Sequence, residues 1–182
     1  RMRFSTGNRL INNYAEGNSK YGIQIRLASN DTLIQGNTVI NNTLYGIYVS
    51  GPEDPETGDP VGESTHNARL INNFATLNVG GIRLVNTHND TVEGNNVTNN
   101  GYGLYTENVS DLIIQFNNIF SNPDYNYLNN QTPQVVAENN WWGSSNVSIV
   151  SSTILGPVDF DPFLTQLSSP VVGAAFCGNA NV

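Results

Sequence analysis

Side chains able to bind a sugar chain recur at one position of successive segments of the sequence. Tyrosine offers an aromatic face with a hydroxyl group, arginine a planar cation and glutamine an amide, and such groups stack on sugars or hydrogen-bond to them. Glu107, two residues beyond one of the tyrosines, is a carboxylate that could serve as a base. The glycan-binding candidates are Gln24, Tyr48, Arg83, Tyr105 and Tyr127. A structural interpretation also stays open, in which this row is an aromatic ladder that stabilises stacked strands.

Metal-binding side chains are sparse in the sequence. His66 and His88 fall in predicted loops of different segments and lack a two-histidine metal spacing, so no metal ligand is assigned. Residues 51–64 form a stretch rich in proline, glycine and acidic residues. Its carboxylates could hold Ca²⁺ through oxygen ligands, although the EF-hand spacing is absent, and a plain solvated loop is the other interpretation. These acidic residues are Glu53, Asp54, Glu56, Asp59 and Glu63.

These candidates are positioned by an internal repeat. Asparagine anchors recur at Asn13, Asn37, Asn73, Asn95, Asn117 and Asn139, and the last three intervals are each 22 residues. A second asparagine row follows at Asn18, Asn42, Asn78, Asn100 and Asn122. The interval from 37 to 73 is 36 residues, so 14 residues are extra, and they correspond to the stretch 51–64. A fixed period in the low twenties is typical of a solenoid.

Two positions of each repeat are apolar and predict inward-facing rows. One row lies three residues before the anchors and the other two residues after them, and a short alternating strand beginning Gly-Ile or Gly-Leu follows. Helices are disfavoured because the runs are short, β-branched and interrupted by asparagine and glycine. The predicted inward rows are Leu10, Ile34, Leu70, Val92, Ile114 and Val136, and Ala15, Val39, Ala75, Val97, Ile119 and Trp141.

The sequence therefore predicts an all-β fold, a right-handed parallel β-helix of about six coils, in which the asparagine rows form hydrogen-bonded ladders. The predicted domain spans residues 1–164, with an inserted loop at 51–64, and residues 165–182 form a C-terminal tail. Trp141, on the inward row, and Trp142 are expected to cap the apolar end of the last coil.

The amino-acid composition argues against several classes of binding partner. The net charge is −8, with one lysine and six arginines, which argues against binding to nucleic acid or to anionic membranes. No run of 18 apolar residues predicts membrane insertion. Cys177 is the single cysteine, so no disulfide framework is expected within the chain. Seven sequons provide glycosylation candidates: Asn30, Asn41, Asn89, Asn96, Asn108, Asn130 and Asn146.

The repeats resemble those of right-handed parallel β-helix proteins of the pectate-lyase-like superfamily, and most closely its NosD-like and surface-layer-associated members. The resemblance spans about residues 4–164 and is most specific at Asn139-Asn140-Trp141-Trp142-Gly143-Ser144. It implies a fold rather than an activity. The galacturonase motifs are missing, as is the Asp-Pro-His motif of alginate epimerases, so no catalytic residue is assigned. The copper binding that a NosD resemblance implies finds no two-histidine spacing.

We therefore predict an extracellular or cell-surface β-helix without catalysis, with a structural or adhesive role and no cofactor. The alternative is a carbohydrate-active protein, either a polysaccharide lyase or epimerase or a glycan-binding module, that uses the Tyr48, Arg83 and Tyr105 row. Polysaccharide is the expected partner in that case. Residues 170–177 are apolar and uncharged, so self-association by end-to-end stacking of coils into a filament is a further expectation.

Overall fold

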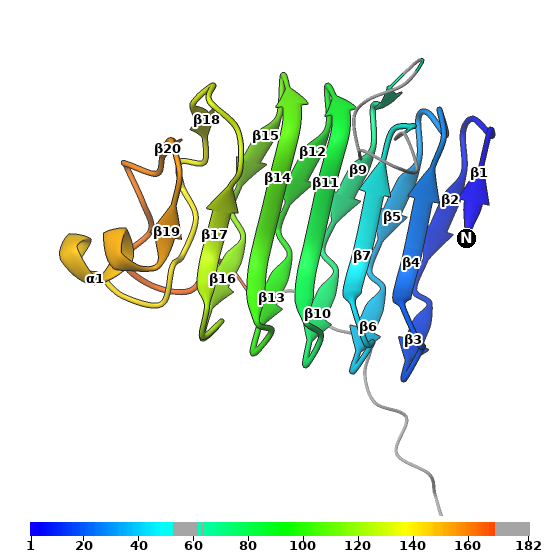
Figure 1. The fold of residues 1–182 in the computed structure, drawn as a ribbon. Helices are drawn as coiled ribbons and strands as arrows, with labels where there is room; N and C mark the ends of the chain where they lie inside the picture. The colour runs from blue at the N-terminus through cyan, green and yellow to red at the C-terminus, as the bar shows by residue number, and fades with distance from the viewer. Residues whose placement is uncertain (53–61, 63, 170–182) are drawn as a thin grey trace, which may run out of the picture.

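The structure is a computed structural model that describes residues 1–52, 62 and 64–169. Its strands stack side by side along one axis, from β1 at one end to β19 and α1 at the other (Figure 1). The named strands of the described chain pair in parallel, and their partners lie one coil apart, as Val92 and Ile114 do. The prediction of a parallel β-helix of about six coils is therefore confirmed.

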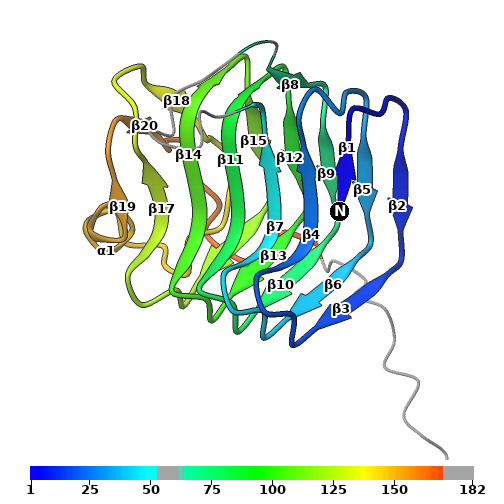
Figure 2. The ribbon, with the colours of Figure 1, turned by 45° about the vertical axis from the view of Figure 1, so that its right-hand side comes forward.

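Three parallel sheets form the sides of the solenoid (Figure 2). The first is the longest and contains β1 (Met2–Arg3), β4 (Tyr21–Arg26), β7 (Tyr45–Ser50), β11 (Gly80–His88), β14 (Tyr102–Ser110), β17 (Tyr125–Asn129) and β19 (Ile154–Leu155), with β8 (Thr65–His66) paired to β11. The second contains β2 (Arg9–Ile11), β5 (Leu33–Gln35), β9 (Arg69–Ile71), β12 (Thr91–Glu93) and β15 (Ile113–Gln115).

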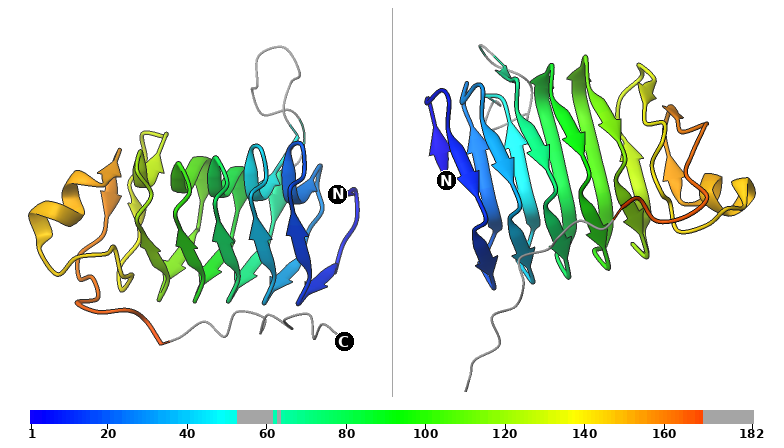
Figure 3. Two further views of the ribbon diagram at one scale, coloured as in Figure 1. Left: turned by 90° about the horizontal axis from the view of Figure 1, so that it is seen from below. Right: turned by 180° about the vertical axis from the view of Figure 1, so that it is seen from behind.

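The third sheet contains β3 (Tyr14–Glu16), β6 (Thr38–Ile40), β10 (Phe74–Thr76), β13 (Asn96–Thr98) and β16 (Asn118–Phe120). A separate pair, β18 (Val135–Val136) and β20 (Val158–Asp159), lies beyond the last coil of the second sheet. The one helix of the described chain is α1 (Val147–Ser152), which the sequence did not predict. Seen from below, the coils lie in a row, with α1 at one end (Figure 3).

The predicted inward rows form the core over most of the solenoid. Ile34, Leu70, Val92 and Ile114 are at most 2 % exposed, and so are Val39, Ala75, Val97 and Ile119 in the other row. The glycines that open the long strands are required by close packing. A Cβ atom at Gly46 would lie 2.8 Å from the carbonyl oxygen of Gly81 in the next coil and 2.8 Å from the Val39 side chain.

Both asparagine ladders exist. In the first, the backbone N–H of Asn73 and its side-chain Nδ2 both donate to Oδ1 of Asn95, at 2.8 and 2.9 Å. Asn95 repeats both bonds to Asn117, and its Nδ2 also donates to the carbonyl of Leu70 at 2.8 Å. Each buried amide is satisfied by the coils on both sides, which is what burial of a polar side chain requires.

The last member of the first ladder is Asn140, and the prediction of Asn139 is wrong. Asn117 donates from its backbone N–H and from Nδ2 to Oδ1 of Asn140, both at 2.9 Å. Asn139 has φ +58° and takes the left-handed position that precedes each ladder residue. Glycine and asparagine adopt that conformation most easily. Equivalent residues in earlier coils are Asn12, Gly36, Asn72, Gly94 and Phe116.

One extra residue in the turn around Pro123 explains this shift. Asn100 and Asn122 are ladder partners 22 residues apart, whereas Tyr102 and Tyr125 pair 23 residues apart. Everything beyond the turn is therefore displaced by one position. Val136 and Trp141 are not inward, since Val136 is 52 % exposed, and the core positions are taken by Ala137 and Trp142.

The apolar end of the last coil is covered by Trp142, as predicted, whereas Trp141 does not take the inward position. Trp142 is 2 % exposed, and its ring stacks on that of Tyr127 with 6.2 Å between the ring centroids. Val150 of α1 is fully buried, and Phe160 and Phe163 pack against the same core. Asn146 caps the helix by accepting a hydrogen bond from the N–H of Ser148.

Several predictions fall on residues outside the described chain. These are the acidic loop residues Glu53, Asp54, Glu56, Asp59 and Glu63, and also Cys177 and the apolar segment 170–177. The boundaries proposed for the domain, the inserted loop and the tail likewise remain predictions. In the part of the chain that the structure describes, no helix combines the length and apolar character needed to cross a membrane.

Candidate functional site

The predicted glycan-binding row lies on the outer side of the long sheet, with one change. Gln24 pairs with Tyr48, Tyr48 with Arg83, Arg83 with Tyr105, and Tyr105 with Leu128. The row is therefore correct through four coils and ends at Leu128.

The outward placement of Tyr127 is wrong, because the extra residue near Pro123 moves it into the core. Tyr127 pairs with Leu104, is fully buried, and forms a hydrogen bond of 2.9 Å between its hydroxyl and that of Thr106. Burial raises the pKa of Tyr127, so this phenol stays neutral.

Two other members of the row are covered by their neighbours. Tyr48 is 3 % exposed and Gln24 8 %, so neither presents a free surface to a ligand. The ring of Tyr21 stacks on Tyr48 with 5.0 Å between centroids, and the Tyr45 ring lies 6.0 Å away. Tyr48 therefore supports the outer rings.

A second row of tyrosines forms the outer layer, and the sequence interpretation missed it. Tyr21 pairs with Tyr45, Tyr45 with Gly80, Gly80 with Tyr102, and Tyr102 with Tyr125. The rings of Tyr21 and Tyr45 stack at 6.3 Å, as do those of Tyr102 and Tyr125. At Gly80 the missing side chain leaves space that the ring of Tyr45 fills. The repeat period applied to tyrosine alone would have found this row.

Arg83 lies at the centre of this surface. Its guanidinium carbon is 4.7 Å from the ring centroid of Tyr105, 5.3 Å from that of Tyr45 and 5.4 Å from that of Tyr48. These distances are within the range of cation–π attraction. Burial alone would lower the pKa of Arg83, but the three tyrosines and Glu107 raise it overall, so the side chain is a fixed cation.

Glu107 joins the arginine to the tyrosines. Its Oε2 lies 3.4 Å from Nη2 of Arg83 and accepts a 2.8 Å hydrogen bond from the Tyr105 hydroxyl. Nδ2 of Asn130 donates to Oε1 of Glu107 at 3.2 Å and to the Tyr105 hydroxyl at 3.0 Å. Burial and the bond to Glu107 raise the pKa of Tyr105 to about 12. The network therefore offers a neutral phenol beside a paired cation and carboxylate.

We call this surface the tyrosine face. It combines half-exposed rings with a central polar group whose side chains hold one another in place. Such a surface can stack on the apolar faces of sugar rings and exchange hydrogen bonds with their hydroxyls. Its members are Tyr21, Tyr45, Tyr48, Arg83, Tyr102, Tyr105, Glu107, Tyr125 and Asn130.

The two histidines lie together, contrary to the sequence interpretation. His66 belongs to β8 and His88 to β11, where they pair in register, and their rings stack with 4.9 Å between centroids. The interval of 22 residues between them is one coil, which was the signal for this contact. Nδ1 of His88 shares a 2.6 Å hydrogen bond with the Ser64 hydroxyl.

The histidine pair does not make a metal centre with the other described residues. Nowhere in residues 1–52, 62 and 64–169 do three or more His, Cys, Asp or Glu side chains come together in a way that could hold a metal ion. Two imidazoles, one of which is already hydrogen-bonded to Ser64, provide too few ligands to enclose a metal ion.

The glycosylation candidates differ in exposure. Asn41, Asn89, Asn108, Asn130 and Asn146 are exposed, while Asn30 and Asn96 are half-buried. Asn130 and Asn146 already use their side chains, in the Glu107 network and the helix cap respectively. Use of these sequons stays a prediction.

Comparison with known families agrees with the coil architecture. The family described as "Periplasmic copper-binding protein (NosD)" matches residues 56–154, more than half of the chain, and "Right handed beta helix region" matches residues 1–61. No curated protein and no solved structure matches. The stacked parallel coils and the family match lead to one conclusion: the chain belongs to the NosD family of right-handed β-helix repeat proteins.

Proposed function

We propose that this protein is a non-catalytic β-helix working outside the cytoplasm, with a structural or adhesive role in which the tyrosine face binds an extended glycan. The family description calls NosD periplasmic, which supports a location outside the cytoplasm. The observation that carries the proposal is the tyrosine face itself. Partly exposed rings stand as two stacked pairs along the solenoid axis, Tyr21 with Tyr45 and Tyr102 with Tyr125, and the coil of Gly80 and Arg83 lies between them. The surface therefore extends over several coils and suits a long ligand.

The polar centre of the face favours binding over catalysis. Glycoside hydrolysis uses two carboxyl groups on either side of the scissile bond. Within the tyrosine face Glu107 is the one carboxylate, and its oxygens are engaged by Arg83, Tyr105 and Asn130. Its role in the proposal is to hold Arg83 and Tyr105 in position.

Copper binding, which the family description names, is not part of the proposal. The described residues place two imidazoles together without a third donor of the kind copper prefers. The donor set therefore does not fit, and no step of the proposal involves a metal.

A panel of neutral and acidic polysaccharides tests the proposal by affinity electrophoresis and calorimetry. At least one glycan should bind, and Tyr45→Ala and Tyr102→Ala should each weaken its binding by about fivefold, since one aromatic contact contributes on the order of 1 kcal/mol. The matched control is Tyr14→Ala, an exposed tyrosine of β3 outside the face. Equal binding by all three variants, or no binding by the parent, would refute the proposal.

The same incubations decide between binding and cleavage. Reducing ends and unsaturated ends are followed with and without Ca²⁺. We expect neither to increase above the level of glycan alone. New ends that Glu107→Gln abolishes would make the protein a carbohydrate-active enzyme instead.

A further inference from the structure

Backbone hydrogen bonds link each coil to the next, but among the described residues they are missing at the corner just before β15, in the fifth coil. At this corner Asp31, Asn67 and Asn89 each donate their N–H to a carbonyl of the following coil, at 3.1, 3.2 and 3.0 Å. Asp111 is the next residue of this row. Its N–H makes no backbone hydrogen bond to any described residue.

The neighbouring carbonyl row ends in the same way. The carbonyls of Thr32, Ala68 and Asp90 accept from the N–H groups of Arg69, Thr91 and Ile113, at 2.9, 2.8 and 3.0 Å. Leu112 continues this row, and no described backbone N–H donates to its carbonyl. A donor and an acceptor on adjacent residues are thus left open at the edge of the second sheet, where β15 is the terminal strand.

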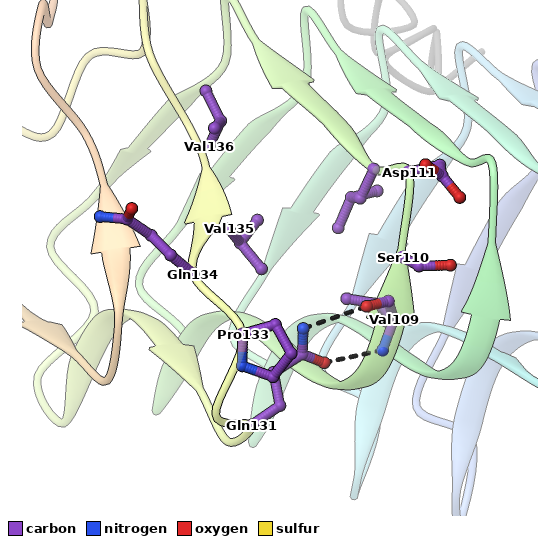
Figure 4. A pocket seen from close by; sticks show the side chains of 9 residues that line it. Val109, Ser110, Asp111, Gln131, Pro133, Gln134, Val135 and Val136 are labelled. Atoms are coloured by element: carbon purple, nitrogen blue, oxygen red, sulfur yellow. Dashed lines mark hydrogen bonds between the residues drawn. The ribbon is translucent and has the colours of Figure 1, made fainter.

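The cause is that the sixth coil moves away from the fifth. Its strand β18 pairs with β20 instead of with β15. Where the backbones separate, the Gln131 side chain spans the gap, accepting from the N–H of Val109 at 2.7 Å and donating to its carbonyl at 3.0 Å (Figure 4). An amide side chain here takes the place of a paired strand.

The separation leaves a groove between the two coils. One cavity of about 340 Å³ lies between the corner at Ser110 and Asp111 and the strand of Val135 and Val136 (Figure 4). A second cavity of about 250 Å³ continues it along β15, and both are lined by Leu112 and Val136. Leu112 and Val135 belong to the core or pack on it, so the groove opens onto apolar side chains. Val136 and Ile113 stand half-exposed beside it.

We propose that this groove, here called the β15 groove, receives residues 171–176 of the chain's own C-terminal segment as an added strand. Strand addition at a free edge uses backbone bonds for affinity and side-chain pockets for specificity. The open N–H of Asp111 and carbonyl of Leu112 supply such bonds. The groove supplies apolar contacts that suit Val171, Val172 and Phe176.

The position and length of the chain support this occupant. The N–H of Ser168 donates to Oδ1 of Asn118 at 2.8 Å, so the chain passes three residues beyond the end of β15. Thirteen residues of the sequence follow Ser169, and an extended segment of that length reaches roughly 43 Å. The six residue-to-residue steps from Leu112 to Asn118 span at most about 21 Å. Residues 170–182 carry no Asp, Glu, Lys or Arg, so inserting them buries no charge.

The single cysteine of the sequence provides the test. Ile113→Cys and Val136→Cys place a second thiol on the β15 groove, and Arg69→Cys places one at the position equivalent to Ile113 two coils away. A disulfide forms only when the two Cα atoms come within about 7 Å. Under mild oxidation we expect an internal disulfide to Cys177 in at least one groove variant, at tenfold or higher yield than in the Arg69→Cys control. Equal yields, or no disulfide, would overturn the proposal.

Two further measurements decide the remaining outcomes. Disulfide-linked dimers in place of internal disulfides would show that a second copy supplies the strand, and the proposal of the chain's own segment would fail. In hydrogen exchange of the unmodified protein, the Asp111 amide should be protected at least tenfold more than in a chain that ends at Ser169. The Asn89 amide, bonded in both, should not change. Equal exchange at Asp111 would show that nothing fills the groove.

Discussion

The carboxylate of Asp90 is buried with one oxygen lacking a hydrogen bond to any described residue, and its replacement by a neutral side chain should stabilise the protein. The residue is 1 % exposed. Oδ1 accepts a 2.7 Å hydrogen bond from the N–H of Ala68, while Oδ2 and the nearby hydroxyl of Thr87 have no hydrogen-bond partner among the described residues. Burial raises the pKa of Asp90 from 3.8 to about 6, against smaller opposing effects from Thr87, Ala68 and His66.

The size of the effect follows from that pKa. The folded state binds the proton more tightly than the unfolded state, so stability is lost as pH rises from about 4 through 6. A difference of 6 − 3.8, about 2 pK units, costs about 3 kcal/mol once the carboxyl is fully ionised. An asparagine in place of Asp90 would keep the acceptor for Ala68 and present an amide donor to Thr87. Asp90→Asn should therefore be more stable than the parent at pH 7.5, by up to about 3 kcal/mol.

Urea unfolding of parent and Asp90→Asn at pH 7.5 and 4.5 measures this. The advantage of the variant should be largest at pH 7.5 and should shrink to less than half at pH 4.5, where the parent carboxyl is protonated in the folded state. Asp124→Asn, which removes an exposed carboxylate, is the control for the loss of one negative charge. If the difference between parent and Asp90→Asn is the same at both pH values, ionisation of the buried Asp90 carboxyl does not destabilise the fold and the reasoning is wrong.

Three other changes test the register, the core and the inserted loop. Asn140→Ala should lower the free energy of unfolding in urea by at least about 3 kcal/mol, because it leaves the buried donors of Asn117 without an acceptor. Asn139→Gly should be nearly neutral, because glycine adopts the φ of +58° at this position easily. Equal losses of stability would mean that Asn139, and not Asn140, is the ladder residue. Ile114→Asp places an unpaired charge at a position 2 % exposed and should abolish the cooperative thermal transition, unlike Ile113→Asp on the half-exposed outer side. Deleting residues 53–63 should leave the melting temperature within a few degrees of the parent, since the extra 14 residues lie outside the repeat; loss of the folded state would make the loop structural.

The repeat in the sequence was enough to predict the fold. The paired asparagines and the two apolar rows recur because each coil must satisfy a buried amide and contribute to the same core, and both requirements fix residue type as well as spacing. The core positions from Ile34 to Ile114 were correct for this reason. The outer row through Gln24, Tyr48, Arg83 and Tyr105 was correct because side chains alternate strictly along a strand.

The errors have a common physical origin. A turn can absorb one residue without disturbing the strands on either side, and the turn at Pro123 does so. Counting in steps of 22 then misplaced Tyr127, Val136, Asn139 and Trp141 by one position. The burial of Tyr48 could not be predicted, because it depends on which way the rings of Tyr21 and Tyr45 turn. The contact between His66 and His88 was available from the period but hidden by the assumption that both lay in loops.

A left-handed residue stands directly before each asparagine of the first ladder, and this has a consequence for how such chains change length. The left-handed residue before the ladder asparagine is a glycine or an asparagine in every coil except that of Phe116. The coils therefore begin with equivalent junctions. Removing residues 95–116 would join Gly94 directly to Asn117, which recreates the junction that Gly94 and Asn95 make now. Pairings between the remaining coils would keep their register, because each strand depends only on its immediate neighbours. The number of coils is therefore a property that insertion or loss of a 22-residue unit can alter in one step, while a gain of one residue is tolerated only in a turn.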